Sequence, residues 1–196
     1  MCTWFDETVG ALRDVLDERG VADDTVVVYV TDNGWINRRD ASRYAPRSKR
    51  SPYDGGLRTP IMVHWPGHVA PGRSDALACS IDLAPTILTL AGVDVPAELP
   101  GVDLLDSAAI EARSVLHGVV YSHDAVDYAE PGANWEYRWC VADGWKLITP
   151  NTARLPGAAT QLYKIVDDAH EQNDLAAAMP EVVERLSKSI EAWMSE

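Results

Sequence analysis

Two neighbouring residues in the N-terminal part of the chain are well suited to binding a metal ion. Asp32 and Asn33 follow an apolar run from Val26 to Val30, and they offer one charged and one neutral oxygen side by side. Such oxygens suit a hard cation such as Ca²⁺ or Mg²⁺, which needs more ligands than these two. An ordinary turn is the alternative, because Asp-Asn-Gly is common in turns. A metal here would therefore take further ligands from elsewhere.

A basic segment follows this pair in an otherwise acidic chain. The formal charge is −13 in total, yet seven basic residues lie between positions 38 and 58: Arg38, Arg39, Arg43, Arg47, Lys49, Arg50 and Arg58. A focused positive charge favours an anion site, and a solvated loop is the alternative. Lys49 could hold the oxygens of a sulfate or phosphate ester and stabilise charge on the leaving oxygen. Arg47 and Arg50 could do the same, and residue type alone does not choose among the three.

The elements that carry these residues predict an α/β fold. Helical spacing of apolar residues runs from Trp4 to Leu16, and the β-branched run at 26–30 predicts a strand buried on both faces of a parallel sheet. Ligands of such sheets lie at the carboxyl ends of the strands, where Asp32 and Asn33 fall. A second short strand is expected from Pro60 to Trp65. We expect Asp82 to cap a helix over residues 83–91.

A smaller unit is predicted in the C-terminal half. Strand-like segments occupy residues 114–122, 137–142, 145–149 and 161–166. Asp143-Gly144 is a strong two-residue hairpin signal. An apolar stripe over residues 180–194 predicts a helix that covers this small antiparallel sheet. We therefore expect a domain of residues 1–105 and an α+β subdomain of residues 106–196.

Composition excludes several classes of function. The net charge argues against a nucleic-acid partner or an anionic membrane surface. No apolar run reaches the length of a membrane span. The cysteines Cys2, Cys79 and Cys140 are widely spaced, which indicates neither a zinc site nor a disulfide framework.

Several motifs together resemble the type I sulfatases of the alkaline phosphatase superfamily, in that family's order along the chain. They are residues 31–34, 49–60, 65–67, 82–86, 145–148, 161–163 and 171–176. The resemblance implies part of a mostly parallel sheet with flanking helices, followed by a small antiparallel sheet and a C-terminal helix. Residues 1–105 would then be part of the catalytic domain.

The resemblance also implies a function and assigns residues to it. It implies hydrolysis of a sulfate ester of a small molecule or carbohydrate, in a periplasmic or secreted protein. Asp32 and Asn33 match the family's calcium ligands, and Lys49 matches the lysine that contacts the sulfate ester and the leaving group. His123 is implied at the mouth of the substrate site, with an ordinary surface histidine as the alternative.

The chain also departs from the family pattern. The family's nucleophile is a formylglycine made from Cys or Ser in a C/S-x-P/A-x-R motif, and none of the three cysteines lies in one. The paired aspartates that complete the calcium shell are missing as well. We therefore expect a truncated chain that is inactive alone, with the nucleophile and the other ligands upstream. The alternatives are a phosphodiester or phosphonate hydrolase of the same superfamily and a non-catalytic anion- or partner-binding module.

Overall fold

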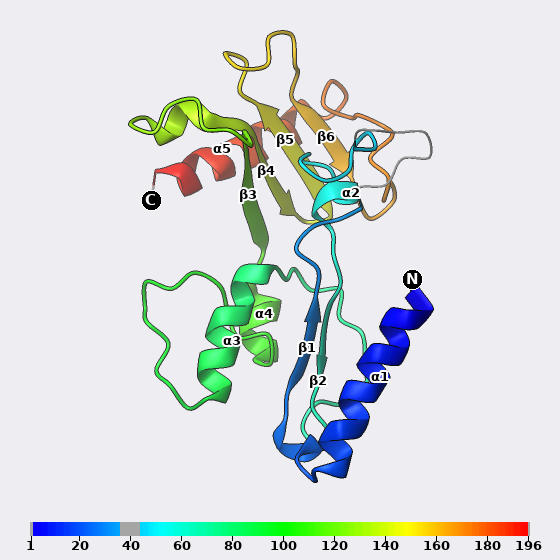
Figure 1. The fold of residues 1–196 in the computed structure, drawn as a ribbon. Helices are drawn as coiled ribbons and strands as arrows, with labels where there is room; N and C mark the ends of the chain where they lie inside the picture. The colour runs from blue at the N-terminus through cyan, green and yellow to red at the C-terminus, as the bar shows by residue number, and fades with distance from the viewer. Residues whose placement is uncertain (1, 36–43, 196) are drawn as a thin grey trace. The chain divides into compact units, whose positions relative to one another are not determined.

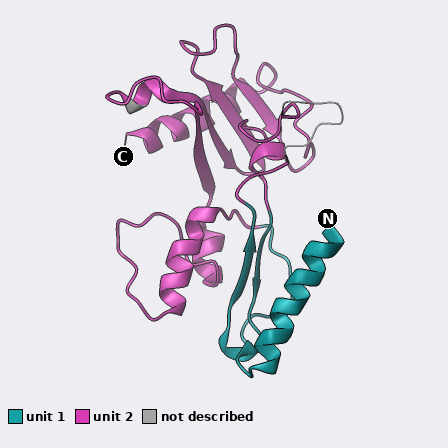
Figure 2. Ribbon diagram, viewed as in Figure 1, with its two compact units in different colours: residues 1–31, 60–75 teal, residues 32–59, 76–196 magenta. Residues whose placement is uncertain are grey.

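The computed structural model describes residues 2–35 and 44–195. The chain forms two compact units, one of residues 1–31 and 60–75 and the other of residues 32–59 and 76–196 (Figure 2). These units divide the chain at other positions than the predicted boundary between residues 105 and 106, which stays a prediction. No helix in the described part of the chain is both long and apolar enough to cross a membrane.

The first unit combines one long helix with a strand pair (Figure 1). It contains α1 (Cys2–Glu18), the short 3-10 helix η1 (Ala22–Asp24), β1 (Val27–Val30) and β2 (Ile61–His64). The predicted N-terminal helix is confirmed, and both predicted strands form. Phe5 of α1 packs on Tyr29 of β1, with 5.7 Å between the ring centroids.

The predicted parallel sheet is not confirmed. β1 pairs antiparallel with β2, so that Val27 lies opposite His64 and Val30 opposite Ile61. All four β1 residues are half-buried rather than fully buried. An apolar β-branched run indicates a strand, but the direction of its neighbour depends on how the chain returns.

The second unit contains a four-stranded antiparallel sheet, as the hairpin signal and the C-terminal stripe predicted. Its strands β3 (Val115–Tyr121), β4 (Trp135–Ala142), β5 (Trp145–Pro150) and β6 (Gln161–Lys164) lie in sequence order. Asp143 and Gly144 join β4 to β5, both with positive φ, as a type I′ turn requires. The 3-10 helix η3 (Pro131–Asn134) precedes β4.

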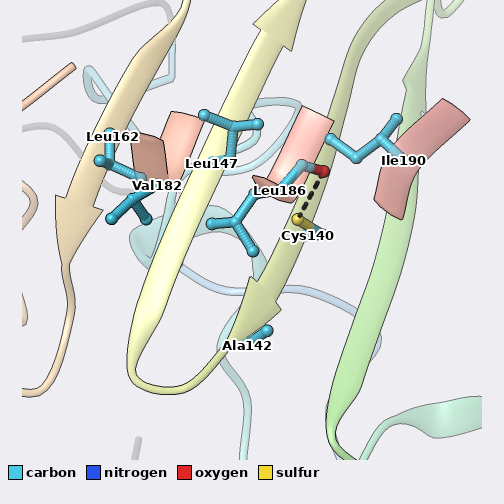
Figure 3. Packing of buried hydrophobic residues seen from close by; sticks show 7 residues of the cluster. All are labelled: Cys140, Ala142, Leu147, Leu162, Val182, Leu186 and Ile190. Carbon is cyan, nitrogen blue, oxygen red and sulfur yellow. Dashed lines mark hydrogen bonds between the residues drawn. The ribbon is translucent and has the colours of Figure 1, made fainter. Parts of the chain in front are cut away.

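The two faces of this sheet are covered differently. Helix α5 (Pro180–Met194) packs its buried residues Val182, Leu186 and Ile190 against one face (Figure 3). That face presents the cross-strand row Cys140, Leu147 and Leu162. Since side chains alternate along a strand, the next row points the other way. This second row is Val141, Lys146 and Tyr163.

The second unit also contains several short helices, one of which ends in a buried carboxylate, Asp82. They are α2 (Asp54–Leu57), η2 (Ser80–Asp82), α3 (Leu83–Leu90) and α4 (Ser107–Ala112). The prediction that the Asp82 side chain caps the following helix is wrong, because it accepts no hydrogen bond from α3. Its oxygens instead accept the N–H groups of Cys79 and Val102 and pair with Arg113, at 2.5 Å from Nη2 to Oδ1.

Burial alone would raise the pKa of Asp82, but the hydrogen bonds from Arg113 and the backbone lower it below 3.8. Arg113 lies 31 residues further along the chain, so local sequence rules could not identify this partner.

Candidate functional site

The predicted metal ligands and the predicted lysine belong to one compact loop cluster. We give this name to the segments Asp32–Trp35, Arg47–Ser51 and Tyr53–Leu57, which are joined by backbone hydrogen bonds. The N–H of Gly34 donates to the carbonyl of Gly56 at 2.9 Å, and the N–H of Trp35 donates to that of Gly55 at 3.1 Å. The N–H of Lys49 donates to the carbonyl of Trp35 at 2.9 Å. The segment that carries Asp32 and Asn33 and the segment that carries Lys49 therefore meet through the backbone.

Three glycines make this close approach possible. A Cβ atom on Gly34 would lie 2.1 Å from the carbonyl oxygen of Gly55. One on Gly55 would lie 2.4 Å from the carbonyl oxygen of Arg47, and one on Gly56 would lie 2.2 Å from that of Ser48. Gly55 and Gly56 thus let backbone pack directly against backbone, which a side chain at either position would prevent.

Asp32 and Asn33 lie at the end of β1, as expected for exposed oxygen ligands. Asp32 is exposed, whereas Asn33 is half-buried and donates from Nδ2 to the carbonyl of Gly34 at 2.8 Å. That bond leaves the Oδ1 atom of Asn33 to accept, so the pair fits part of a hard-cation shell. Within residues 2–35 and 44–195, no group of three or more His, Cys, Asp or Glu side chains could hold a metal ion.

Lys49 lies between two arginines with left-handed backbone. Arg47 has φ 55° and Arg50 has φ 69°. The Arg47 guanidinium lies 4.6 Å from the Tyr53 ring centroid and donates to the backbone carbonyl of Glu171, so it holds the structure together. Arg50 is exposed near the Tyr44 ring. Arg38, Arg39 and Arg43, which the sequence also offered for anion binding, lie outside the described residues.

A buried ion-pair network anchors the loop cluster to the sheet. The Nζ atom of Lys146, on β5, lies 2.7 Å from Asp54 Oδ1 and 2.8 Å from Glu171 Oε1. The contact with Oε1 is close enough for an ion pair, although it is not aligned as a hydrogen bond. Glu171 Oε2 accepts the Asp54 N–H at 2.7 Å. Burial alone would raise the pKa of Asp54, but Lys146 and then Arg58 lower it below 3.8.

A tyrosine provides a second anchor on the same face of the sheet. The Tyr53 hydroxyl donates to Gln161 Oε1 at 2.7 Å, and its ring packs edge-on against Tyr163. Burial raises the pKa of Tyr163 to about 12, and Tyr53 adds to the effect. Tyr163 therefore stays neutral at ordinary pH.

The sequence did not predict this anchoring. Lys146 and Glu171 were noticed only within family motifs, with no role attached. One signal was present: Lys146 stands in an apolar strand, between Trp145 and Leu147. A lysine that alternates into a buried face must have a carboxylate partner, although the sequence does not say which.

His123 lies apart from these anchors. It is exposed, in the connection between β3 and η3. Among the described residues, no hydrogen bond, ion pair or ring contact joins His123 to the loop cluster. Its predicted place at the substrate mouth therefore stays a prediction.

Neither Cys79 nor Cys140 has the surroundings of an activated nucleophile. Cys2 is exposed, Cys79 is half-buried and Cys140 is buried, and none forms a disulfide within the described residues. Burial raises the pKa of Cys140 to about 11 and also raises the pKa of Cys79. Raised values favour the thiol over the reactive thiolate.

Comparisons of the sequence with known proteins match sulfatases. The sulfatase family model matches residues 1–93. The chain is 38% identical to arylsulfatase A of Homo sapiens over 105 residues, which are 51% of this chain and 21% of that protein. The chain thus spans about a fifth of that relative's length.

Two solved structures share the fold over nearly the whole chain. One is a protein in complex with its substrate D-glucosamine-2-N,6-O-disulfate, with a TM-score of 0.70, 22% identity, and coverage of 97% of this chain and 38% of the other. The second is the phosphonate monoester hydrolase of Agrobacterium radiobacter, with a TM-score of 0.71, 19% identity, and coverage of 97% and 39%. At these identities the likeness concerns the fold alone.

Proposed function

This chain is a relative of the sulfatases, and we propose that it forms part of a sulfuric ester hydrolase in which Lys49 binds the sulfate group. One observation carries the proposal. The Lys49 N–H donates to the carbonyl of Trp35, two residues after Asn33, so Lys49 belongs to the same loop cluster as Asp32 and Asn33. A cation and two oxygen ligands at one site suit an anionic ester that also contacts a metal.

Lys49 would act through its ammonium group. It would donate to the non-bridging oxygens of the sulfate and lower the energy of charge that develops on the leaving oxygen. Arg47 is less suited to this role, because its guanidinium is already held over Tyr53 and by the Glu171 carbonyl. These contacts do not bear on Arg50; we assign the anion contact to Lys49 because Lys49 matches the lysine of the sulfatase family pattern.

Asp32 and Asn33 would hold a calcium ion together with ligands from outside this pair. When bound, the ion would supply positive charge next to the sulfate oxygens. The chain's own part would be to offer these two oxygens just after β1 and to hold the Lys49 backbone against Trp35 in the same loop cluster. The proposed substrate is a sulfated carbohydrate or small molecule, a choice supported by the disulfated glucosamine bound to one structure of the same fold.

Substitution of Lys49 tests the proposal in the intact protein. Lys49→Ala should lower kcat for an aryl sulfate roughly 100-fold or more, because it removes a donor to the developing charge. Lys188→Ala is the matched control, since Lys188 is exposed on α5 and pairs only with Glu184 among the described residues. Full activity of Lys49→Ala would contradict the assignment.

A second candidate is a phosphonate or phosphodiester hydrolase, favoured by the fold likeness to phosphonate monoester hydrolase. Parallel assays of the intact protein on an aryl sulfate and on the matching phosphonate monoester separate the two. A higher kcat/KM for the sulfate supports the proposal, and the reverse result supports the alternative. Binding of either anion without hydrolysis would support a non-catalytic anion-binding module instead.

Calcium dependence needs its own measurement. Calorimetry should detect Ca²⁺ binding to the intact protein, and Asp32→Ala should weaken it through the loss of a charged ligand. Asp124→Ala is a suitable control, because Asp124 is an exposed carboxylate outside the loop cluster. Unchanged affinity in Asp32→Ala would overturn the calcium assignment and leave the Lys49 assignment standing.

A further inference from the structure

We propose that Lys146 is a positioning residue for Lys49 and acts through Asp54 and Glu171. The proposal rests on the function proposed for Lys49. The side chain of Lys146 is only 1% exposed, so it does not contact substrate. Its role would be to fix the backbone that carries Lys49.

The network around Lys146 holds one residue of the loop cluster, Asp54, through contacts with Lys146 and Glu171. Lys146 Nζ contacts a carboxylate oxygen of Asp54 and one of Glu171, at 2.7 and 2.8 Å. Glu171 in turn accepts the backbone N–H of Asp54 at 2.7 Å. Asp54 is therefore fixed through both its side chain and its backbone, from two segments that are distant in the sequence.

The chain between Lys49 and Asp54 is tightly packed and internally hydrogen-bonded. Pro52 is fully buried, and the Ser51 hydroxyl donates to the Ser48 carbonyl at 2.6 Å. Gly56 packs against the same carbonyl with no room for a side chain. A displacement of Asp54 would therefore move Ser48 and Lys49 with it.

The conformation around Lys49 also needs outside support. Arg47 and Arg50 adopt left-handed backbone, which costs an L-residue free energy unless the surrounding contacts hold it. The Arg47 side chain finds that support at the Glu171 carbonyl. Glu171 is itself left-handed, with φ 53°. Glu171 thus joins the ion network to the strained residue that lies two positions before Lys49.

The ionic character of the network favours a positioning role over a purely stabilising one. Buried ion pairs contribute little net stability compared with apolar packing of similar volume, although removal of one partner is costly. The hydrogen bonds from Lys146 Nζ to Asp54 Oδ1 and from the Asp54 N–H to Glu171 Oε2 do impose direction and distance, which apolar side chains do not. Apolar clusters already exist on both faces of this sheet, so the network is not needed to supply packing on its own face.

Amide hydrogen exchange on the 196-residue chain provides the first test. Lys146→Met should speed exchange at the Lys49 and Gly56 amides about tenfold or more, while amides of β4 and β5 stay protected. Arg113→Met is the matched control, because it also removes the cation of a buried pair, with Asp82, outside the loop cluster. The proposal is overturned if both variants alter the Lys49 amide equally, or if neither does.

Kinetics of the intact protein provide the second test. Lys146→Met should lower kcat for an aryl sulfate about 10- to 100-fold through misplacement of Lys49, with roughly constant KM. Lys146→Arg keeps the positive charge and should retain part of the kcat that Lys146→Met loses. If Lys146→Met fails to fold, Glu171→Gln serves, because it keeps an oxygen for the Asp54 N–H and removes the charge. That variant should show a smaller loss of the same kind.

The outcomes separate this proposal from the one on which it rests. Full activity in Lys49→Ala would remove the function proposed for Lys49, whatever Lys146 does. Loss of activity in Lys49→Ala, together with unchanged kcat in a folded Lys146→Met protein, would overturn the positioning role alone.

Discussion

The two faces of the C-terminal sheet differ in the kind of contact that covers them. The face under α5 is apolar, with Leu147 and Leu162 packed against Leu186 (Figure 3). The opposite face also has an apolar cluster, with Ile148 and Tyr163 buried, but it carries Lys146 as well and receives the loop cluster through ion pairs and hydrogen bonds. Apolar contacts have no preferred direction, whereas the polar contacts fix angles and distances. The first face thus supplies stability, and we infer that the second supplies placement.

The comparison predicts its largest effect on the apolar face. Leu186→Ala should lower the free energy of unfolding by about 2–5 kcal/mol, because Leu186 is 1% exposed and its loss leaves a cavity. Urea denaturation followed by circular dichroism measures this change. A loss below about 1 kcal/mol would mean that α5 is not the main source of stability.

A glycine substitution should have a smaller and more local effect. Gly56→Ala should cost about 1–3 kcal/mol, because its Cβ would meet the Ser48 carbonyl oxygen at 2.2 Å. Amide exchange should rise in the loop cluster before it rises in the sheet. Gly10→Ala is the control, since no atom lies within 4 Å of the new Cβ, and it should stabilise α1 by up to about 1 kcal/mol. Equal effects of the two substitutions would contradict the close packing.

Removal of one hydroxyl should have a smaller effect again. Tyr53→Phe deletes the hydrogen bond to Gln161 and should cost about 1 kcal/mol, while the ring contact with Tyr163 remains. Thermal unfolding with Tyr128→Phe as control measures it, because Tyr128 is 92% exposed. An effect no larger than that of the control would show that this hydroxyl does not anchor the loop cluster.

The last prediction concerns the loss of stability in acid, which leaves the protein unchanged at neutral pH. The pKa values of Asp54 and Asp82 are lowered on folding from 3.8, so both carboxylates stabilise the protein above that value. This stabilisation should be lost as the pH falls below about 4, through the lowered folded-state pKa values. Urea midpoints measured from pH 7 to pH 2 test the prediction. A constant midpoint over that range, or a fall that is complete above pH 5, would contradict it.

The same contrast explains which predictions succeeded. The helix stripe over residues 180–194 and the Asp143-Gly144 hairpin are local patterns, and both formed as predicted. The direction in which β1 pairs is not set by local sequence, because a run of β-branched residues fits either a parallel or an antiparallel neighbour. The structure pairs β1 antiparallel with β2. Asp82 stood where a cap is expected, but Arg113 engages its side chain.

The sequence by itself determined the positions of most strands and helices, the hairpin and the motif that groups Asp32, Asn33 and Lys49. Only the tertiary structure decided that Lys146, 92 residues after Asp54, meets it beneath the loop cluster, and that Glu171 closes the network. The physical reason is that periodicity and turn chemistry act over a few residues, whereas a buried charge takes whichever partner the fold brings within about 3 Å.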